Sequence, residues 1–230
     1  MERVTISIAS IPDRNFFLNK TIHSLHGQCD EIRVYLNNYP DIPEWMDRFP
    51  KVIPYLADNT YGDGARYLNP PENGWWLTCD DDIYYPNTYV SDMIAGVERY
   101  GGAVIVTLHG SIFGATHHEV FTGPDSRERV YRCLGNVDED VVVHLGGTGV
   151  MCFHCDTFRP DLSRFERKNM ADIWVAVQAK EAGIPIMVLK HEVGYLQYIL
   201  PLDKWTIWKH TERNMYENEY RAGIINKHLR

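Results

Sequence analysis

Short apolar runs alternate with amphipathic stretches along the first half of the chain. Five runs rich in β-branched and aromatic residues predict strands, over 4–9, 31–36, 52–56, 75–78 and 103–108. Apolar positions at helical spacing predict helices after Pro12 and from Asn87, taken as an N-cap, to Tyr100. This order of strands and helices predicts an α/β fold, Rossmann-like, with a mostly parallel central sheet flanked by helices.

The second half of the chain is less regular and predicts a smaller, mixed arrangement. Strands are expected over 130–134, 141–145, 150–153 and 185–189, with helices over 169–182 and near the end of the polar tail. A length of 230 residues is within the range of one hydrophobic core. We therefore expect a single domain over 1–230, with halves 1–110 and 111–230.

Composition excludes several classes of protein. Hydrophobic residues make up 44% and charged residues 23%, as in soluble globular proteins. The longest apolar run, 103–108, is far shorter than the ~20 residues of a membrane span, and no leader-like apolar segment is seen, so we expect a cytoplasmic protein. A net charge of −8 argues against a broad nucleic-acid surface. Five irregularly spaced cysteines indicate free thiols.

The most informative motif is the aspartate triplet Asp80, Asp81 and Asp82, which follows the apolar run 75–78 and precedes Ile-Tyr-Tyr-Pro. In open α/β sheets, ligands bind at the carboxyl ends of strands. If the triplet is extended, Asp80 and Asp82 share a side and Asp81 faces elsewhere. A hard divalent cation, Mg²⁺ or Mn²⁺, would compensate such charges together with substrate phosphates. A solvated acidic turn is the alternative, and the apolar flanks favour a site.

The triplet and its flanks resemble the nucleotide-sugar motif of GT-A glycosyltransferases. The closer likeness is to bacterial capsule α-N-acetylglucosaminyltransferases of the heparosan type, with glycosyltransferase family 2 more distant. Further segments match in the same order along residues 4–190: Ser10-Ile11-Pro12-Asp13-Arg14, Ile22 to Gln28, Leu36-Asn37, Asp63-Gly64-Ala65-Arg66, His109-Gly110, Leu145 to Gly149, and Ala171-Asp172. At 65–66 the chain carries Ala-Arg where the relatives tend to carry Gly-Lys.

The resemblance implies a GT-A fold and transfer of a sugar, expected to be N-acetylglucosamine, from a UDP-sugar to a carbohydrate acceptor, with retention. Residues 1–110 would bind the nucleotide sugar and 111–230 the acceptor. The resemblance implies that the nucleotide pocket is lined by Ser10, Pro12 and Arg14, that Asn37 lies at the uracil, and that the base and diphosphate are held by Asp63 and Arg66. Ribose and sugar hydroxyls would be contacted by Asp80 and Asp81, and the donor also by Gly147 and Thr148. Asp82 would bind Mn²⁺ or Mg²⁺, and Asp172 would be catalytic.

Several of these positions also allow a purely structural interpretation. Asp172 could simply place a negative charge at a helix N-terminus. The glycine-rich residues 146–149 could form a tight entry into the next strand, and they lack the Lys-Ser/Thr of a phosphate-binding P-loop. A late histidine often completes the metal site in GT-A enzymes, and His191, His210 or neither could do so. The pair Cys152 and Cys155 is a weak zinc signal.

The loops and the tail offer few defined signals for the acceptor. His117-His118 could contact it, and Lys209 and Arg213 in the tail could close over the diphosphate. Other functions stay open: a catalytically silent sugar- or nucleotide-binding module, or a glycosyltransferase acting on modified nucleic-acid bases, against which the charge argues. A sugar nucleotidyltransferase would need a glycine-rich basic loop after the first strand, and residues 10–14 do not form one. The oligomeric state is not predicted.

Overall fold

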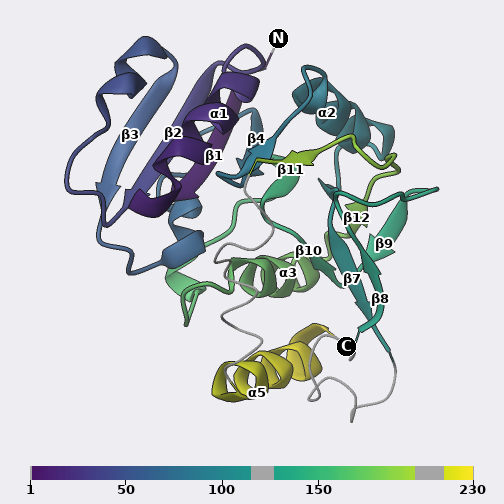
Figure 1. Ribbon diagram of the computed structural model, residues 1–230. Helices are drawn as coiled ribbons and strands as arrows, with labels where there is room; N and C mark the ends of the chain where they lie inside the picture. The colour runs from purple at the N-terminus through teal and green to yellow at the C-terminus, as the bar shows by residue number, and fades with distance from the viewer. Residues whose placement is uncertain (1, 115–126, 200–214, 230) are drawn as a thin grey trace.

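The computed structural model describes residues 2–114, 127–199 and 215–229 (Figure 1). It confirms the predicted α/β fold, because an eight-stranded, mostly parallel sheet is flanked by helices. The strands of this sheet, in spatial order, are β3 (Val52–Ala57), β2 (Glu31–Asn37), β1 (Val4–Ser10), β4 (Trp75–Cys79), β11 (Val150–His154), β6 (Ile105–Thr107), β12 (Ile186–Val188) and β9 (Val141–Val143).

Two strands of the sheet run antiparallel to their neighbours. Strands β3, β2, β1 and β4 are parallel to one another, as are β6 and β12, whereas β11 runs antiparallel to both β4 and β6 and β9 runs antiparallel to β12. Two small sheets complete the fold: β10 (Leu145–Gly146), β7 (Gly110–Phe113) and β8 (Arg127–Tyr131) form one, and β13 (Gln197–Tyr198) and β5 (Ile83–Tyr84) form the other.

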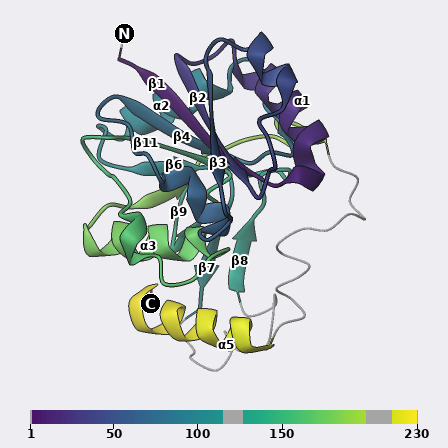
Figure 2. The ribbon, with the colours of Figure 1, turned by 90° about the vertical axis from the view of Figure 1, so that its left-hand side faces the viewer.

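The central strands are buried on both faces, so their side chains alternate between two hydrophobic cores. In β4, Leu77 packs in the core beneath α1 (Asn15–Leu25) and α2 (Tyr89–Arg99), whereas its neighbour Trp76 packs in the core beneath α3 (Ala171–Glu181). The helix α5 (Met215–Ile224) lies against the outer side of α3 in both views (Figures 1 and 2). This two-sided burial explains why the strands read as continuous apolar runs.

The carboxyl ends of β1, β2 and β4 meet at one edge of the sheet. Antiparallel β11 begins at this same edge, because Val150 is paired with Cys79, the last residue of β4. The loop that precedes β11 therefore lies directly beside the aspartate triplet. Two short 3₁₀ segments, η1 (Pro12–Arg14) and η3 (Gly62–Tyr67), also lie at this edge of the sheet. Residues far apart in the sequence are thus brought to one place.

Some predicted boundaries are wrong, for local reasons. Helix α3 begins at Ala171 and not at Asn169, because Asn169 has a φ of 59° and lies outside the helical region. Helix α2 begins at Tyr89 after Thr88, so Asn87 is not its N-cap. The expected strand 141–145 is divided between β9 and β10. In the described ranges no helix is long and apolar enough to cross a bilayer.

Candidate functional site

The aspartate triplet lies in the turn after β4, and its side chains do not alternate as an extended segment would. Asp80 follows the last strand residue, and Asp81 and Asp82 form a turn before β5. Asp81 and Asp82 share one partner, since Nη1 of Arg14 lies 2.8 Å from Oδ1 of Asp81 and 2.7 Å from Oδ2 of Asp82. The alternation expected of an extended triplet, with Asp80 and Asp82 on one side, therefore does not apply, because the strand ends at Cys79, before the triplet.

Arg14 thus contacts two carboxylates in this structure, and its place in a nucleotide pocket stays a prediction. Both carboxylates are almost fully buried, and burial raises the pKa of Asp82 to about 7, with the neighbouring charges of Asp81 and Asp80 acting in the same direction and Arg14 opposing them. Burial also raises the pKa of Asp81. The second oxygen of Asp81, Oδ2, is buried without a hydrogen-bond partner among the described residues. The pair therefore needs more positive charge than Arg14 supplies.

The ends of β1 and β2 supply the neighbouring polar groups. Ser10 is buried, and its hydroxyl lies 3.2 Å from that of Tyr39, whereas Pro12 is exposed at the start of η1. Asn37 is buried and donates through Nδ2 to the carbonyl oxygen of Gly62, at 2.9 Å. Its side-chain oxygen has no partner among the described residues. The amide is thus oriented with a free acceptor.

Asp63 connects η3 to the start of α3. Its Oδ2 accepts from the backbone N–H of Ala171 at 3.3 Å, while Oδ1 is buried and unpartnered in the described part of the chain. Burial raises the pKa of Asp63 to about 6; Arg66 opposes this shift, and the charge of Asp172 adds to it. Asp172 is in the first turn of α3, where its Oδ1 accepts from the N–H of Ile173 at 2.9 Å. The two aspartates therefore face one region.

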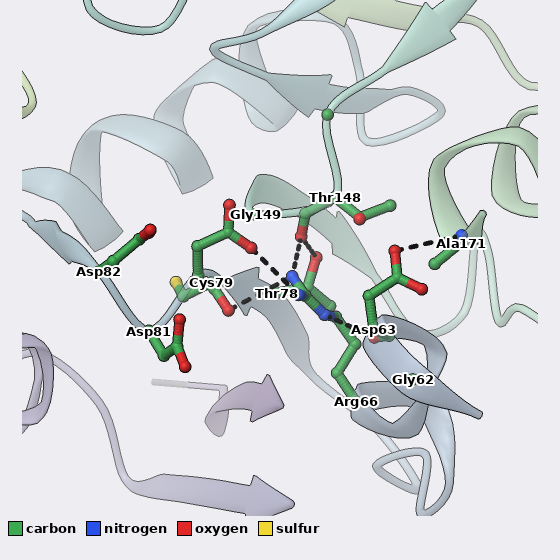
Figure 3. A network of polar contacts seen from close by, with 12 residues as sticks. Gly62, Asp63, Arg66, Thr78, Cys79, Asp81, Asp82, Thr148, Gly149 and Ala171 are labelled. Carbon is green, nitrogen blue, oxygen red and sulfur yellow. Dashed lines mark hydrogen bonds and ion pairs between the residues drawn. The ribbon is translucent and has the colours of Figure 1, made fainter. Parts of the chain in front are cut away.

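Arg66 is buried, and each of its three side-chain nitrogens donates to a protein oxygen (Figure 3). The acceptors include the carbonyl oxygen of Thr148 at 2.8 Å and Oδ1 of Asp80 at 3.0 Å. These bonds use four of the five N–H groups of the guanidinium, so a diphosphate could reach Arg66 without displacing a bond only through the remaining N–H of Nη2. The role of Arg66 as a direct diphosphate ligand stays a prediction.

The glycine-rich loop before β11 is packed into the fold. The carbonyl of Thr148 accepts from the hydroxyl of Thr78 at 2.6 Å as well as from Arg66, and that of Gly147 accepts from Thr107 Oγ1 at 3.0 Å. A Cβ on Gly147 would approach Cβ of His109 to 2.8 Å, which is closer than packing allows. The glycines therefore allow a close approach of segments at the edge of the triplet.

His191 is held by backbone carbonyls rather than turned toward the triplet. Its Nδ1 lies 2.7 Å from the carbonyl oxygen of Leu189, and its Nε2 lies 3.2 Å from that of Arg132. Both ring nitrogens are thus directed at backbone carbonyl oxygens, so nothing in the site supports its predicted ligand role. His210, Lys209, Arg213 and His117-His118 lie outside the described residues.

Neither of the metal clusters considered from sequence is assembled as a complete set of protein ligands. In residues 2–114, 127–199 and 215–229, no group of three or more His, Cys, Asp or Glu side chains is arranged to hold a metal ion. Cys152 and Cys155 are free and buried, which gives no support to the weak zinc signal. A cation at the triplet would therefore need ligands beyond those that the described residues assemble, such as substrate oxygens or water.

Two residues of the site escaped the sequence reasoning. The hydroxyl of Tyr85 donates to the carbonyl oxygen of Gly149 at 2.7 Å and lies 2.9 Å from the backbone nitrogen of Asp80. Asn169 reaches from the segment before α3 to the backbone N–H of Asp63, at 3.4 Å. Asparagine is enriched at positive φ, so an Asn at the first position of the predicted helix 169–182 is a signal that could have indicated a turn there.

The negative and positive charges of the side chains that these elements bring together do not sum to zero. Those described are five aspartates and two arginines, which leave three net negative charges when all are ionised: Asp63, Asp80, Asp81, Asp82, Asp172, Arg14 and Arg66. Mutual repulsion and burial disfavour this state, as the raised pKa values show. The site is therefore suited to a ligand that brings a cation or many hydrogen-bond donors.

The raised pKa of Asp63 predicts a pH dependence of stability. A carboxyl with a folded-state pKa of about 6, against 3.8 ordinarily, favours the folded state most below pH 4 and loses that contribution as the pH rises through 6. The free energy of unfolding should fall by up to ~3 kcal/mol across this range, at ~1.4 kcal/mol per pKa unit. Asp63→Asn should flatten this slope in urea unfolding measured at pH 4.5 and 7.5. Equal slopes in the two proteins would contradict the assignment.

The comparisons with known proteins bear on the fold of this chain alone. No protein-family model matches the sequence, and no curated protein shows significant similarity to it. Among solved structures, the chain is similar to residues 1–349 of S. aureus TarS, with a TM-score of 0.50 and 12% identity over 83% of this chain and 59% of that one. A TarS structure in complex with UDP-GlcNAc matches with a TM-score of 0.38 and 16% identity, over 57% of this chain and 45% of that one.

Proposed function

We propose that this chain is a metal-dependent glycosyltransferase that binds a UDP-sugar at the carboxyl edge of its central sheet. The observation that carries the proposal is the set of buried, unpartnered acceptors at that edge: Oδ1 of Asn37, Oδ1 of Asp63 and Oδ2 of Asp81. Buried polar atoms in native proteins are nearly always hydrogen-bonded. A nucleoside brings N–H and O–H donors, and a divalent cation satisfies carboxylate oxygens, so a nucleotide with its metal would complete all three.

The residues at the triplet fit Mn²⁺ or Mg²⁺ as the cofactor. These hard cations are usually held by one or two carboxylates together with substrate phosphates, so a complete protein cage is not required. Asp82 is the proposed ligand, with the unpartnered oxygen of Asp81 beside it. Bound there, the cation would neutralise charge on the departing diphosphate. A site with net negative charge would otherwise repel that diphosphate.

The neighbouring residues have distinct proposed roles. Asn37 and Asp63 present acceptors for the base, at the end of β2 and in η3. The side chain of Asp80 is 44% exposed, against 5% for Asp81 and 8% for Asp82, so Asp80 is the member of the triplet that can accept hydrogen bonds from ribose or sugar hydroxyls. Asp172 would position the acceptor and stabilise positive charge at the anomeric carbon of the transferred sugar.

The finer features of the reaction follow from the sequence resemblance. N-acetylglucosamine as the transferred sugar, a carbohydrate as the acceptor and retention of configuration are all implied by the likeness to capsule transferases. The likeness to TarS is compatible with this proposal at the level of the fold. The acceptor would enter through the second half of the chain, beside the loop that precedes β11.

A screen of UDP-sugars tests the proposed function directly. We expect UDP release with one donor, foremost UDP-N-acetylglucosamine, in the presence of Mn²⁺ and its loss when EDTA is added. Isothermal calorimetry with UDP should show metal-dependent binding. Metal-independent binding of UDP-sugars without any turnover would identify a silent binding module instead, and no binding of any UDP-sugar would refute the proposal.

A further inference from the structure

Arg66 is hydrogen-bonded through all three of its side-chain nitrogens. It is 4% exposed, and its Nε donates to the carbonyl oxygen of Asp63 at 2.9 Å. Its Nη1 donates to the carbonyl oxygens of Thr148 at 2.8 Å and Cys79 at 3.3 Å, and its Nη2 donates to Oδ1 of Asp80 at 3.0 Å. One guanidinium therefore joins η3, the tip of β4 and the loop before β11 (Figure 3).

Asp80 is constrained from the opposite side by Gly149. The backbone N–H of Asp80 donates to the carbonyl oxygen of Gly149 at 3.0 Å, and a Cβ placed on Gly149 would overlap the carboxylate of Asp80. The carboxylate is thus held between a glycine without a side chain and the Nη2 of Arg66. It is nevertheless the only carboxylate of the triplet that is partly exposed.

The bonding pattern requires a guanidinium rather than a positive charge alone. Arg66 donates in four directions at once, from three nitrogens held in one plane. A lysine would carry the same charge on a single nitrogen with three donors and could not reproduce this fork. Charge and geometry can therefore be separated by substitution.

We propose that Arg66 is a positioning residue, which acts through Asp80 by locking its carboxylate to the loop before β11. The proposal rests on the function proposed above, because it concerns how Asp80 is presented to the hydroxyl groups of a donor. It assigns Arg66 no contact with the diphosphate. Misplacement of a binding group by about 1 Å can cost ~100-fold in rate, so the lock matters for turnover.

Comparison of Arg66→Met with Arg66→Lys separates the two roles. If Arg66 positions Asp80, both variants should lose ~10–100-fold in kcat/KM, because lysine restores the charge but not the fork. Substantially higher activity in Arg66→Lys than in Arg66→Met would mean that the charge acts directly on the diphosphate, and would overturn the proposal. Gly149→Ala displaces Asp80 without removing Arg66, so it should lower kcat/KM by a similar factor. Gly27→Ala is the control: a Cβ there meets nothing within 4 Å, so kcat/KM should not change.

A double-mutant cycle between Arg66→Lys and Asp80→Asn provides the second readout. If Arg66 acts through Asp80, its substitution should have little further effect on kcat/KM in the Asp80→Asn background. If instead the double variant loses kcat/KM by the product of the factors of the two single variants, the residues act independently and the proposal is overturned. The same double-mutant cycle can be measured by urea unfolding, which needs no substrate. We expect the effects of the two substitutions on the free energy of unfolding to be coupled. Without this coupling, the proposed positioning of Asp80 by Arg66 is wrong. Failure of the wild type to release UDP, with this coupling intact, would instead refute only the proposed function.

Discussion

Asp82→Asn should abolish metal-dependent UDP release while leaving the fold at least as stable as that of the wild type. A metal ion contributes several kcal/mol to the stabilisation of a leaving diphosphate, and each 1.36 kcal/mol is a factor of ten, so a loss of ~100-fold or more is expected. The measurements are UDP release across a Mn²⁺ titration and the binding of Mn²⁺ in the presence of UDP.

The stability of Asp82→Asn should change in the opposite direction to its activity. Because the folded-state pKa of Asp82 is raised to about 7 from an ordinary 3.8, this carboxyl lowers the stability progressively as the pH rises from 3.8 to 7, and asparagine, which does not ionise, avoids this loss. Arg14 keeps Asp81 as a partner in the variant. Asp156→Asn is a matched control, since Asp156 is exposed and follows the far end of β11. Full activity of Asp82→Asn would remove the metal assignment.

Asp172→Asn should lose sugar transfer and retain donor binding. Loss of one group that stabilises charge in the transition state typically costs ~10²–10³-fold in rate. Asparagine keeps an oxygen that can accept from the N–H of Ile173, so the start of α3 should persist. The loss of the charge from the first turn should cost only ~0.3–1 kcal/mol of stability. The measurements are kcat for transfer and the Kd of UDP with Mn²⁺.

The matched control for Asp172→Asn lies at the other end of the same helix. Glu181→Gln removes a negative charge at the last residue of α3, where the carboxylate pairs with Arg164 on the surface. Its transfer rate should equal that of the wild type. If Asp172→Asn instead abolishes the binding of UDP, then Asp172 belongs to the donor pocket, and its proposed role toward the acceptor is wrong.

The strands of the first half were predictable because they are buried on both faces and therefore appear as uninterrupted apolar runs. The observed β1, β2, β3 and β4 each extend one residue beyond the predicted strand, at the carboxyl end. Strand β4 nevertheless stops at Cys79, so Asp81 and Asp82 lie in a turn, where the alternation of an extended strand no longer applies. The place of the triplet directly after β4 was predictable, and the sharing of Arg14 by two carboxylates was not.

The role of Arg66 illustrates a different limit. The sequence resemblance identified Arg66 as a site residue and implied that it holds the diphosphate. Its actual acceptors include the carbonyl of Thr148, which is brought to β4 only by the antiparallel pairing of β11. His191 was selected from its place after a strand, yet its ring faces the backbone of Leu189 and Arg132. Such partners depend on long-range strand order, which local pattern does not encode.

By itself, the sequence determined the class of fold and which segments of the first half form strands. It also placed three carboxylates directly after an apolar strand. These features could be predicted because burial and turn chemistry are local properties of the chain. The tertiary structure alone decided which charges became neighbours. It paired Asp81 and Asp82 with Arg14, enclosed Arg66 among carbonyl oxygens and left Asp80 facing solvent. Electrostatic interactions act through space over a few ångströms, so contacts between distant segments set them.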